Sequence, residues 1–316
     1  MKRFKTKRRL KFRYKLTLNL IIVLITFVTI FKFLYNKFLI HMDNEHLINY
    51  LVDYNLNTKK NHPLIYDLMN LNSTDFLLKY TLGVETSKDE EPEEKVGFEV
   101  DYVEDPYKTD IKEPILYIYN THQTEGYQKT NNASYNITPS VLMASYILRE
   151  SLNDLGIPAL VETNDISEIL KVHNWKYSYS YAASKLLMKD AMEKNPTLTY
   201  FIDLHRDATS YEASTTTIEN KKYAKILFVI GKDHPNYEKN LKFANTLNDY
   251  LKKNYPTLTR GLAIKSGKGV NGIYNQDMSE NAILIELGGQ YNSIVEVNNT
   301  ITILTKALYA YIKGEL

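Results

Sequence analysis

The feature that most constrains the fold is an alternation of short apolar runs and longer amphipathic runs between residue 114 and the C-terminus. Runs rich in β-branched and aromatic residues predict strands at 115–119, 159–161, 198–204, 225–230 and 282–287. Runs with helical periodicity predict helices at 139–155, 177–193, 236–255 and 295–311. Alternation of this kind is typical of an α/β domain in which helices flank a mainly parallel, twisted sheet.

The N-terminus combines a basic leader with an apolar run. Residues 1–15 contain nine Lys and Arg side chains and no Asp or Glu, and residues 16–31 contain no charged residue. With Lys32 extending toward the lipid headgroups, residues 16–35 supply the ~20 residues that a helix needs to cross a bilayer. A basic leader stays in the cytoplasm, so the rest of the chain is expected on the extracytoplasmic side.

A cleaved signal peptide is the alternative interpretation of the same N-terminus. Such a peptide ends in a small-x-small cleavage site, whereas the residues after this apolar run include Lys37, Phe38, Leu39, Ile40 and His41. We therefore predict an uncleaved single-pass membrane anchor.

Two segments separate the predicted anchor from the α/β region. Residues 36–85 have apolar side chains at mixed spacing and are interpreted as a membrane-proximal helical segment. Residues 86–113 include an acidic run at 88–94 and few apolar side chains, which is typical of a solvated linker. The catalytic or binding domain is therefore predicted to span 114–316.

Charge and composition exclude some classes of function. Without the nine leader cations, 30 of the 39 Lys and Arg remain against 37 Asp and Glu, a formal charge of about −7. A nucleic-acid-binding protein carries positive charge on its folded body, so no nucleic-acid partner is expected. The chain has no cysteine. Any metal site must therefore use His, Asp and Glu.

Polar side chains stand at the ends of three predicted strands. His122 follows the first strand, His205 ends the third, and Glu286 interrupts the apolar run of the last. Sites in open α/β sheets lie outside the carboxyl ends of the strands, so these residues are expected to converge. Catalytic zinc takes three His or carboxylate ligands and leaves one position for water, which a nearby Glu deprotonates. We predict His122 and His205 as ligands and Glu286 as the general base.

Two alternatives remain open for these residues. Each histidine could be a hydrogen-bonded structural residue, and Glu286 could be ion-paired with Arg206. The apolar neighbours of Glu286 predict a raised pKa, because desolvation disfavours the charged carboxylate. A raised pKa suits a group that both accepts and returns a proton.

Four motifs together resemble the stage II sporulation protein P family, over roughly residue 114 to the C-terminus. They are Thr121-His122-Gln123-Thr124-Glu125-Gly126-Tyr127, Asp203-Leu204-His205-Arg206-Asp207-Ala208, Tyr274-Asn275-Gln276-Asp277-Met278-Ser279 and Leu284-Ile285-Glu286-Leu287-Gly288-Gly289. That family is similar to zinc-dependent N-acetylmuramoyl-L-alanine amidases. The resemblance implies a zinc amidase-like fold, Zn²⁺ as cofactor and hydrolysis of the amide between muramic acid and the stem peptide of peptidoglycan. The resemblance leaves open whether the protein also cleaves peptide cross-links.

The resemblance also assigns roles to residues. His122 and His205 match the family's metal histidines, and Glu286 matches its catalytic glutamate. Glu125 matches a motif position and is our predicted third ligand, since residues 136–139 lack the carboxylate that related amidases place at the head of the first helix. Glu162, or a two-histidine site completed by water, are the alternatives.

Other polar and aromatic residues have two interpretations each. Arg206 could bind a stem-peptide carboxylate or form a structural ion pair. Asn275 and Asp277, in a polar loop before the last strand, are predicted to line the substrate groove. One interpretation of His173, Trp175, Tyr177 and Tyr181 is a sugar-stacking edge. The other is that these aromatic side chains pack on one another.

The family resemblance implies a role in forespore engulfment, with stage II sporulation proteins D and M as partners. The protein would then act at the cell membrane, in the septal space between the two membranes of a sporulating cell. Two other functions fit the same residues. One is a wall-binding scaffold with a degenerate site, and the other is a metallopeptidase that acts on proteins.

The predicted topology is testable by proteolysis. A protease added outside intact protoplasts should degrade the chain beyond residue 40, because the basic leader keeps the N-terminus in the cytoplasm. Immunoblotting against the C-terminus measures the loss. Protection of the C-terminal domain would contradict the orientation, and a shortened mature N-terminus would contradict the anchor.

Overall fold

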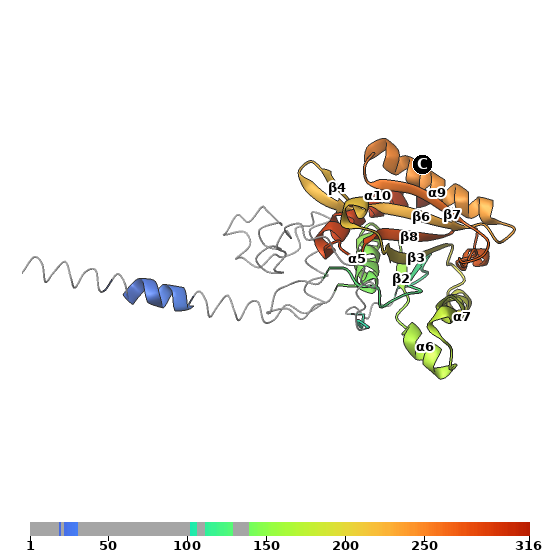
Figure 1. Cartoon of the computed structure of the whole chain (residues 1–316), viewed down its shortest axis with the longest axis horizontal. Coiled ribbons are helices and arrows are strands. Elements are labelled where there is room, and N and C mark those ends of the chain that lie inside the picture. Colours follow the sequence, from blue (N-terminus) through green and yellow to red (C-terminus); the bar gives the residue numbers. More distant parts are fainter. Residues whose placement is uncertain (1–18, 20–21, 31–101, 106–110, 129–138) are drawn as a thin grey trace, which may run out of the picture.

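The structure is a computed structural model that describes residues 19, 22–30, 102–105, 111–128 and 139–316. In this part of the chain, helices pack on both faces of a six-stranded sheet (Figure 1). The sheet strands are β1 (Leu116–Tyr119), β2 (Ala159–Val161), β3 (Tyr200–Asp207), β6 (Ile226–Gly231), β7 (Thr259–Lys265) and β8 (Ala282–Gly289). The larger helices are α5 (Val141–Asp154), α6 (Ile166–Val172), α7 (Ser180–Lys194), α9 (Tyr237–Asn254) and α10 (Ile294–Ile312).

The strand order is β2-β1-β3-β8-β6-β7, and the sheet is mainly parallel, as predicted. Strands β2, β1, β3 and β8 run in one direction, while β6 pairs antiparallel to β8 and parallel to β7. The connection from β3 to β6 explains this reversal. It holds only α8 (Tyr211–Ser214) and the hairpin of β4 (Thr215–Ile218) and β5 (Lys221–Ala224). A parallel strand would need a crossover, usually a full helix.

Several elements were not predicted. They are α6, α8, β7, the β4–β5 hairpin and the two 3₁₀ turns, η1 (Tyr177–Tyr179) and η2 (Gln276–Met278). The helix predicted at 177–193 begins instead with η1 and continues as α7. The hairpin turn places Glu219 and Asn220 at φ of 49° and 63°. Positive φ at both central residues is the requirement of a type I′ turn, which matches the twist of a hairpin.

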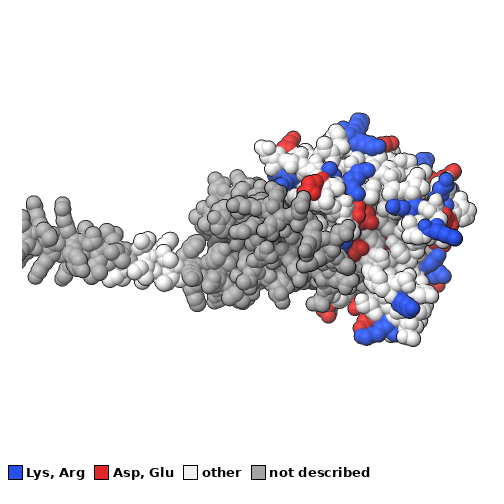
Figure 2. Space-filling view, in the orientation of Figure 1, with Lys and Arg blue, Asp and Glu red and all other residues white. Residues whose placement is uncertain are grey.

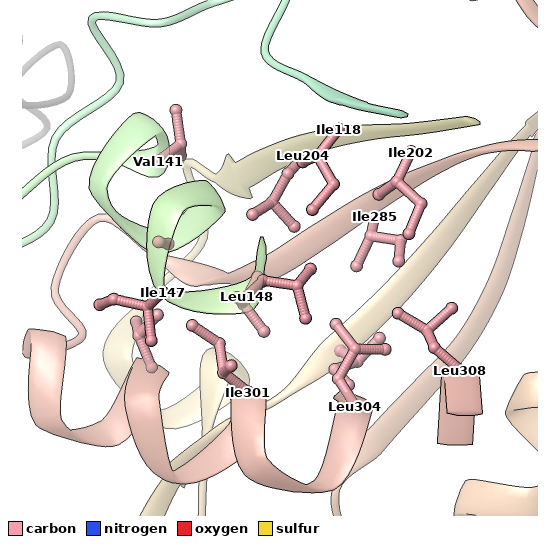
Figure 3. Close-up of a cluster of buried hydrophobic side chains, with 14 of the residues drawn as sticks. Ile118, Val141, Ile147, Leu148, Ile202, Leu204, Ile285, Ile301, Leu304 and Leu308 are labelled. Atoms are coloured by element: carbon pink, nitrogen blue, oxygen red, sulfur yellow. The ribbon is translucent and has the colours of Figure 1, made fainter. Parts of the chain in front are cut away.

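The core divides between the two faces of the sheet. Strand residues alternate, so that Leu116 and Ile118 face α5, α9 and α10, while Tyr117 and Tyr119 face α7. Figure 3 shows part of the larger cluster, with strand residues opposite helix residues: Ile118, Ile202, Leu204, Ile285, Leu148, Ile301, Leu304 and Leu308. A capping box fixes the start of α10, where Ser293 and Glu296 satisfy each other's backbone amides.

Residues 102–105 pack against the domain. Tyr102 and Val103 contact the main hydrophobic cluster, and the hydroxyl of Tyr146 donates to the carbonyl of Val103 over 3.0 Å. The carboxylate of Asp105 accepts hydrogen bonds from both terminal nitrogens of the buried Arg149. The interpretation of 86–113 as a solvated linker therefore does not hold for these four residues.

The predicted anchor lies largely outside the described residues. Residues 22–30 are helical, and no helix among the residues that the structure describes is long and apolar enough to span a membrane. The leader 1–15, the segment 36–85 and most of 86–113 also lie outside the described ranges. Figure 2 shows Lys and Arg interspersed with Asp and Glu over the visible face of the domain.

Candidate metal centre

The ends of β1, β3 and β8 bring the predicted site residues together. His122 and Glu125 belong to one turn after β1, in which the backbone N–H of Glu125 donates to the carbonyl of His122 over 3.1 Å. His205 lies on β3 directly opposite Glu286 on β8. Both side chains project from the face of the sheet that α7 covers, since Phe201 and Ala282 at alternate positions pack there.

His122, Glu125 and His205 form a group that could hold a metal ion. The carboxylate of Glu125 lies between the two rings, with Oε1 3.4 Å from Nδ1 of His122 and Oε2 3.5 Å from Nδ1 of His205. One ligand atom from each residue lies within 4.8 Å of the other two. Two imidazole nitrogens and one carboxylate oxygen match the ligand types of catalytic zinc sites.

The charges of this group depend on one another. Burial acts to raise the pKa of Glu125, but the neighbouring His205 and His122 outweigh it and hold that pKa well below its ordinary value. Burial acts to lower the pKa of His205, but Asp203 and Glu125 outweigh it and hold that pKa well above its ordinary value. Negative charge on both sides of His205 therefore suits a cation at this position.

Asp203 is a site residue that the sequence analysis did not assign. Its Oδ1 lies 2.9 Å from Nε2 of His205, an ion-pair contact rather than an aligned hydrogen bond. Nδ1 of His205 thereby stays directed toward Glu125. Metal-binding histidines commonly have a carboxylate at the second ring nitrogen, which fixes the ring's orientation. The sequence signal was available, because Asp203 and His205 are two residues apart on one strand and share a face.

A hydrogen-bonded network links Asp203 to α7. The backbone N–H and the hydroxyl of Thr121 donate to the two carboxylate oxygens of Asp203, over 2.9 and 2.7 Å. The Thr121 hydroxyl also lies 2.8 Å from the hydroxyl of Ser184 on α7. Asn275 donates to Ser184 over 2.9 Å and to the carbonyl of Tyr181 over 3.0 Å. Asp203 is therefore fixed from two directions.

The residues predicted to bind substrate are engaged in contacts within the protein. Asn275 is buried, has a φ of 56° and contacts α7 through its side chain. Asp277 forms an ion pair with Lys185 at 2.6 Å. Arg206 is buried, and its Nε donates to the carbonyl of Gly126 over 3.0 Å. The structure thus gives each of them a structural contact, and their role toward substrate stays a prediction.

Glu162, the alternative third ligand, lies outside the metal group. Its carboxylate accepts hydrogen bonds from the hydroxyl of Tyr117 and from the backbone N–H of Asn164, the latter over 2.7 Å. These bonds hold it at the end of β2. The geometry therefore favours Glu125 as the third ligand.

Glu286 is a carboxylate in an apolar strand with an unsatisfied oxygen. Its Oε2 is buried and accepts no hydrogen bond from the part of the chain that the structure describes. Burial raises the pKa of Glu286 to about 7, against the opposing charge of His205 and together with the negative charges of Glu125 and Asp207. Buried polar atoms are rarely left without a partner, so this oxygen suits a bound water or substrate.

Aromatic rings from α7 and its neighbours enclose the metal group on one side. Tyr177 stacks on His122 with ring centroids 5.1 Å apart, and Tyr181 stacks on His205 with centroids 6.4 Å apart. Tyr181 also meets Tyr274 edge to face at 5.5 Å. The rings restrict the orientations of both histidines.

Comparisons with known proteins give one family. Residues 51–309 match the profile of the family described as Stage II sporulation protein P (SpoIIP). The curated Stage II sporulation protein P of Bacillus subtilis (strain 168) is 35% identical over 198 residues, which cover 61% of this chain and 49% of that protein. The chain therefore spans about half the length of the curated relative that it matches.

A solved structure of low similarity was also found. The CwlD amidase from Clostridioides difficile, in complex with the GerS lipoprotein, is 15% identical, with a TM-score of 0.41. The match covers 63% of this chain and 97% of that one.

The raised pKa of Glu286 predicts a pH-dependent stability for the metal-free protein. A carboxyl whose pKa rises from 4.5 to about 7 on folding stabilises the fold fully below pH 4.5 and loses this contribution as the pH rises through about 7. Relative to the Glu286→Gln protein, the wild type should lose up to about 3 kcal/mol of unfolding free energy over this range. Urea denaturation with a chelator present measures it. Parallel pH profiles for the two proteins would contradict the raised pKa.

Proposed function

Because the chain belongs to the stage II sporulation protein P family, we propose that it is a membrane-anchored, zinc-dependent N-acetylmuramoyl-L-alanine amidase that hydrolyses peptidoglycan. The observation that carries the proposal is the convergence of His122, Glu125 and His205 with the carboxylate of Glu286, whose Oε2 is buried. A metal group beside a carboxylate is an arrangement that suits metal-assisted hydrolysis of an amide.

The metal would be held by the imidazoles of His122 and His205 and by the carboxylate of Glu125. The residues fit the ion, since the donor set is the one zinc accepts and the negative charge of Asp203 and Glu125 flanks His205. When bound, zinc supplies a Lewis acid that polarises the amide carbonyl and lowers the pKa of a water molecule. Asp203 holds His205 in the orientation that ligation needs.

Glu286 would carry the proton between water and the leaving group. Its carboxylate can accept the proton of the attacking water and then donate it to the amine nitrogen as the C–N bond breaks. The buried Oε2 has no other partner among the described residues, so it is available for this role.

The family supports the biological setting of the proposal. The substrate would be the amide between muramic acid and the stem peptide, with cleavage of peptide cross-links as a second activity to be tested. The protein would act in forespore engulfment with stage II sporulation proteins D and M. Residues 16–35 would anchor it in the cell membrane, with the domain in the septal space.

The bond that is cleaved distinguishes an amidase from the two alternatives, an endopeptidase and a wall-binding scaffold. Mass spectrometry of muropeptides released from purified sacculi should show free stem peptides and intact disaccharides. Products cut only within cross-links would indicate an endopeptidase. The absence of any product, together with retained binding to sacculi, would indicate a wall-binding scaffold.

The metal site makes a prediction about zinc content. The purified chain should hold about one zinc, and His122→Ala or His205→Ala should lose it.

Asp203→Asn should weaken zinc affinity about 10–100-fold, because it removes the charge that orients His205. Competition with a chromogenic chelator measures affinity. Asp277→Asn is the control, since this carboxylate pairs with Lys185 and should leave zinc affinity unchanged. Full retention of zinc by both histidine variants would refute the site.

The assignment of Glu286 as acid and base makes a prediction about rate. Glu286→Gln preserves shape but cannot carry a proton, so it should retain zinc and release stem peptides at least ~100-fold more slowly. Quantified muropeptide release from sacculi gives the rate. Glu280→Gln, at an exposed carboxylate that pairs with Lys239, should keep the wild-type rate. Near-normal activity of Glu286→Gln would remove Glu286 from the mechanism.

A further inference from the structure

A column of three stacked aromatic rings lies on the connection between α6 and α7, beside the metal group. His173 stacks on Trp175 with centroids 4.5 Å apart and an angle of 22°, and Trp175 stacks on Tyr179 at 5.8 Å and 28°. We call these three residues the aromatic column. His173 is exposed, and Tyr179 has 51% of its surface exposed. In Figure 1, α6 and α7 lie below β2 and β3, on the opposite side from α9.

Contacts of Trp175 with the protein fix the position of the column. Trp175 packs on the small cluster that Ile166 and Leu170 form with α7, and its backbone N–H donates to the carbonyl of Leu170 over 2.7 Å. Stacking on both neighbours then restricts His173 and Tyr179. Such a surface loses little conformational entropy when a ligand binds, which is the advantage of a preorganised site.

One 3₁₀ turn connects the column to the candidate metal centre. Tyr177 belongs to the same 3₁₀ turn as Tyr179, and its ring stacks on the metal-site histidine His122. Tyr177 is 54% exposed. A ligand long enough to extend from His122 past Tyr177 would reach the turn that carries Tyr179.

The chemistry of the column suits a chain of N-acetylated sugars. The C–H face of a pyranose ring is apolar and packs flat against an aromatic ring, while its hydroxyl and acetamido groups require polar partners at the edge. Trp175 is covered on both faces by its neighbours, so the two terminal rings, His173 and Tyr179, offer the faces, while the imidazole and the Tyr179 hydroxyl supply polar groups. Exposed apolar patches with a polar rim commonly mark binding sites.

We propose that the aromatic column binds the glycan strand of the substrate, so that the enzyme prefers amides that are still attached to a sugar polymer. The proposal rests on the proposed function, because a muramoyl amide places the glycan strand a few bonds from the scissile carbon. A strand bound beside His122 would pass Tyr177 and reach Tyr179 along the same 3₁₀ turn.

Trp175 is the single tryptophan of the chain, so its fluorescence reports on the column directly. The full chain in detergent is titrated with the tetrasaccharide of N-acetylglucosamine, which has no stem peptide and cannot be cleaved at an amide. We expect a saturable change in tryptophan emission. Tyr179→Ala should weaken binding about tenfold, and Tyr179→Phe should retain it because the ring is preserved.

Val172→Ser is the matched control for non-specific adhesion to an apolar surface. Val172 precedes the column, is 79% exposed and contributes no ring. Its substitution should leave the affinity for the tetrasaccharide unchanged. No saturable change in the wild type, equal affinities for wild type and Tyr179→Ala, or an equal loss in Val172→Ser would overturn the proposal.

Hydrolysis assays separate failure of the column from failure of the proposed function. Tyr179→Ala should raise KM for glycan strands that carry stem peptides, with kcat unchanged, and should leave hydrolysis of a single-sugar muramoyl peptide unchanged. An unchanged KM for the strands would overturn the role of the column. If the wild type cleaves neither substrate, the amidase proposal fails, and the tetrasaccharide titration alone decides whether the column binds sugars.

Discussion

The pairing of β3 with β8 is the constraint on which the candidate site depends. This register sets His205 opposite Glu286 and directs both toward α7, while Leu204 and Ile285 enter the opposite core. A slip of one residue in one of the two strands would move its polar side chain to the other face of the sheet. Leu204 and Ile285 pack against α5 and α10 on that face. This packing keeps the site in register, because a slip would bury a polar side chain in the apolar core.

Two carboxylates a short distance apart acquire different properties from their surroundings. Glu125 lies between two imidazoles and stays ionised, whereas Glu286 lies in an apolar strand and has a pKa of about 7. Divergent pKa values in neighbouring groups are typical of sites that need one permanent anion and one proton carrier. The apolar strand that disfavours ionisation of Glu286 therefore also suits this side chain to its proposed role as proton carrier.

The sequence predicted the parts of the fold that have strong periodicity. Strands β1, β2 and β8 and helices α9 and α10 were predicted within two residues of their bounds, and His122, Glu125, His205 and Glu286 were expected to meet. Strand β7 was missed because Gly261 and polar neighbours weaken its pattern, and the direction of β6 depends on a connection whose path no local pattern reveals. The partners of Asn275 were not predictable, since they lie on α7, about 90 residues earlier in the chain.

The docking of residues 102–105 determines how the domain would bear mechanical load. Asp105 is held by the buried Arg149 of α5, and the hydroxyl of Tyr102 donates to the carbonyl of Thr163 beyond β2. Tension along the chain from the N-terminal side therefore acts first on α5 and on the loop after β2. The loop after β2 is itself bonded to the turn that carries His122, because the side chain of Gln123 donates to the carbonyl of Asn164 over 2.9 Å and accepts from the backbone N–H of Ile166 over 2.8 Å. A pull on residues 102–105 would therefore reach the metal group through Gln123.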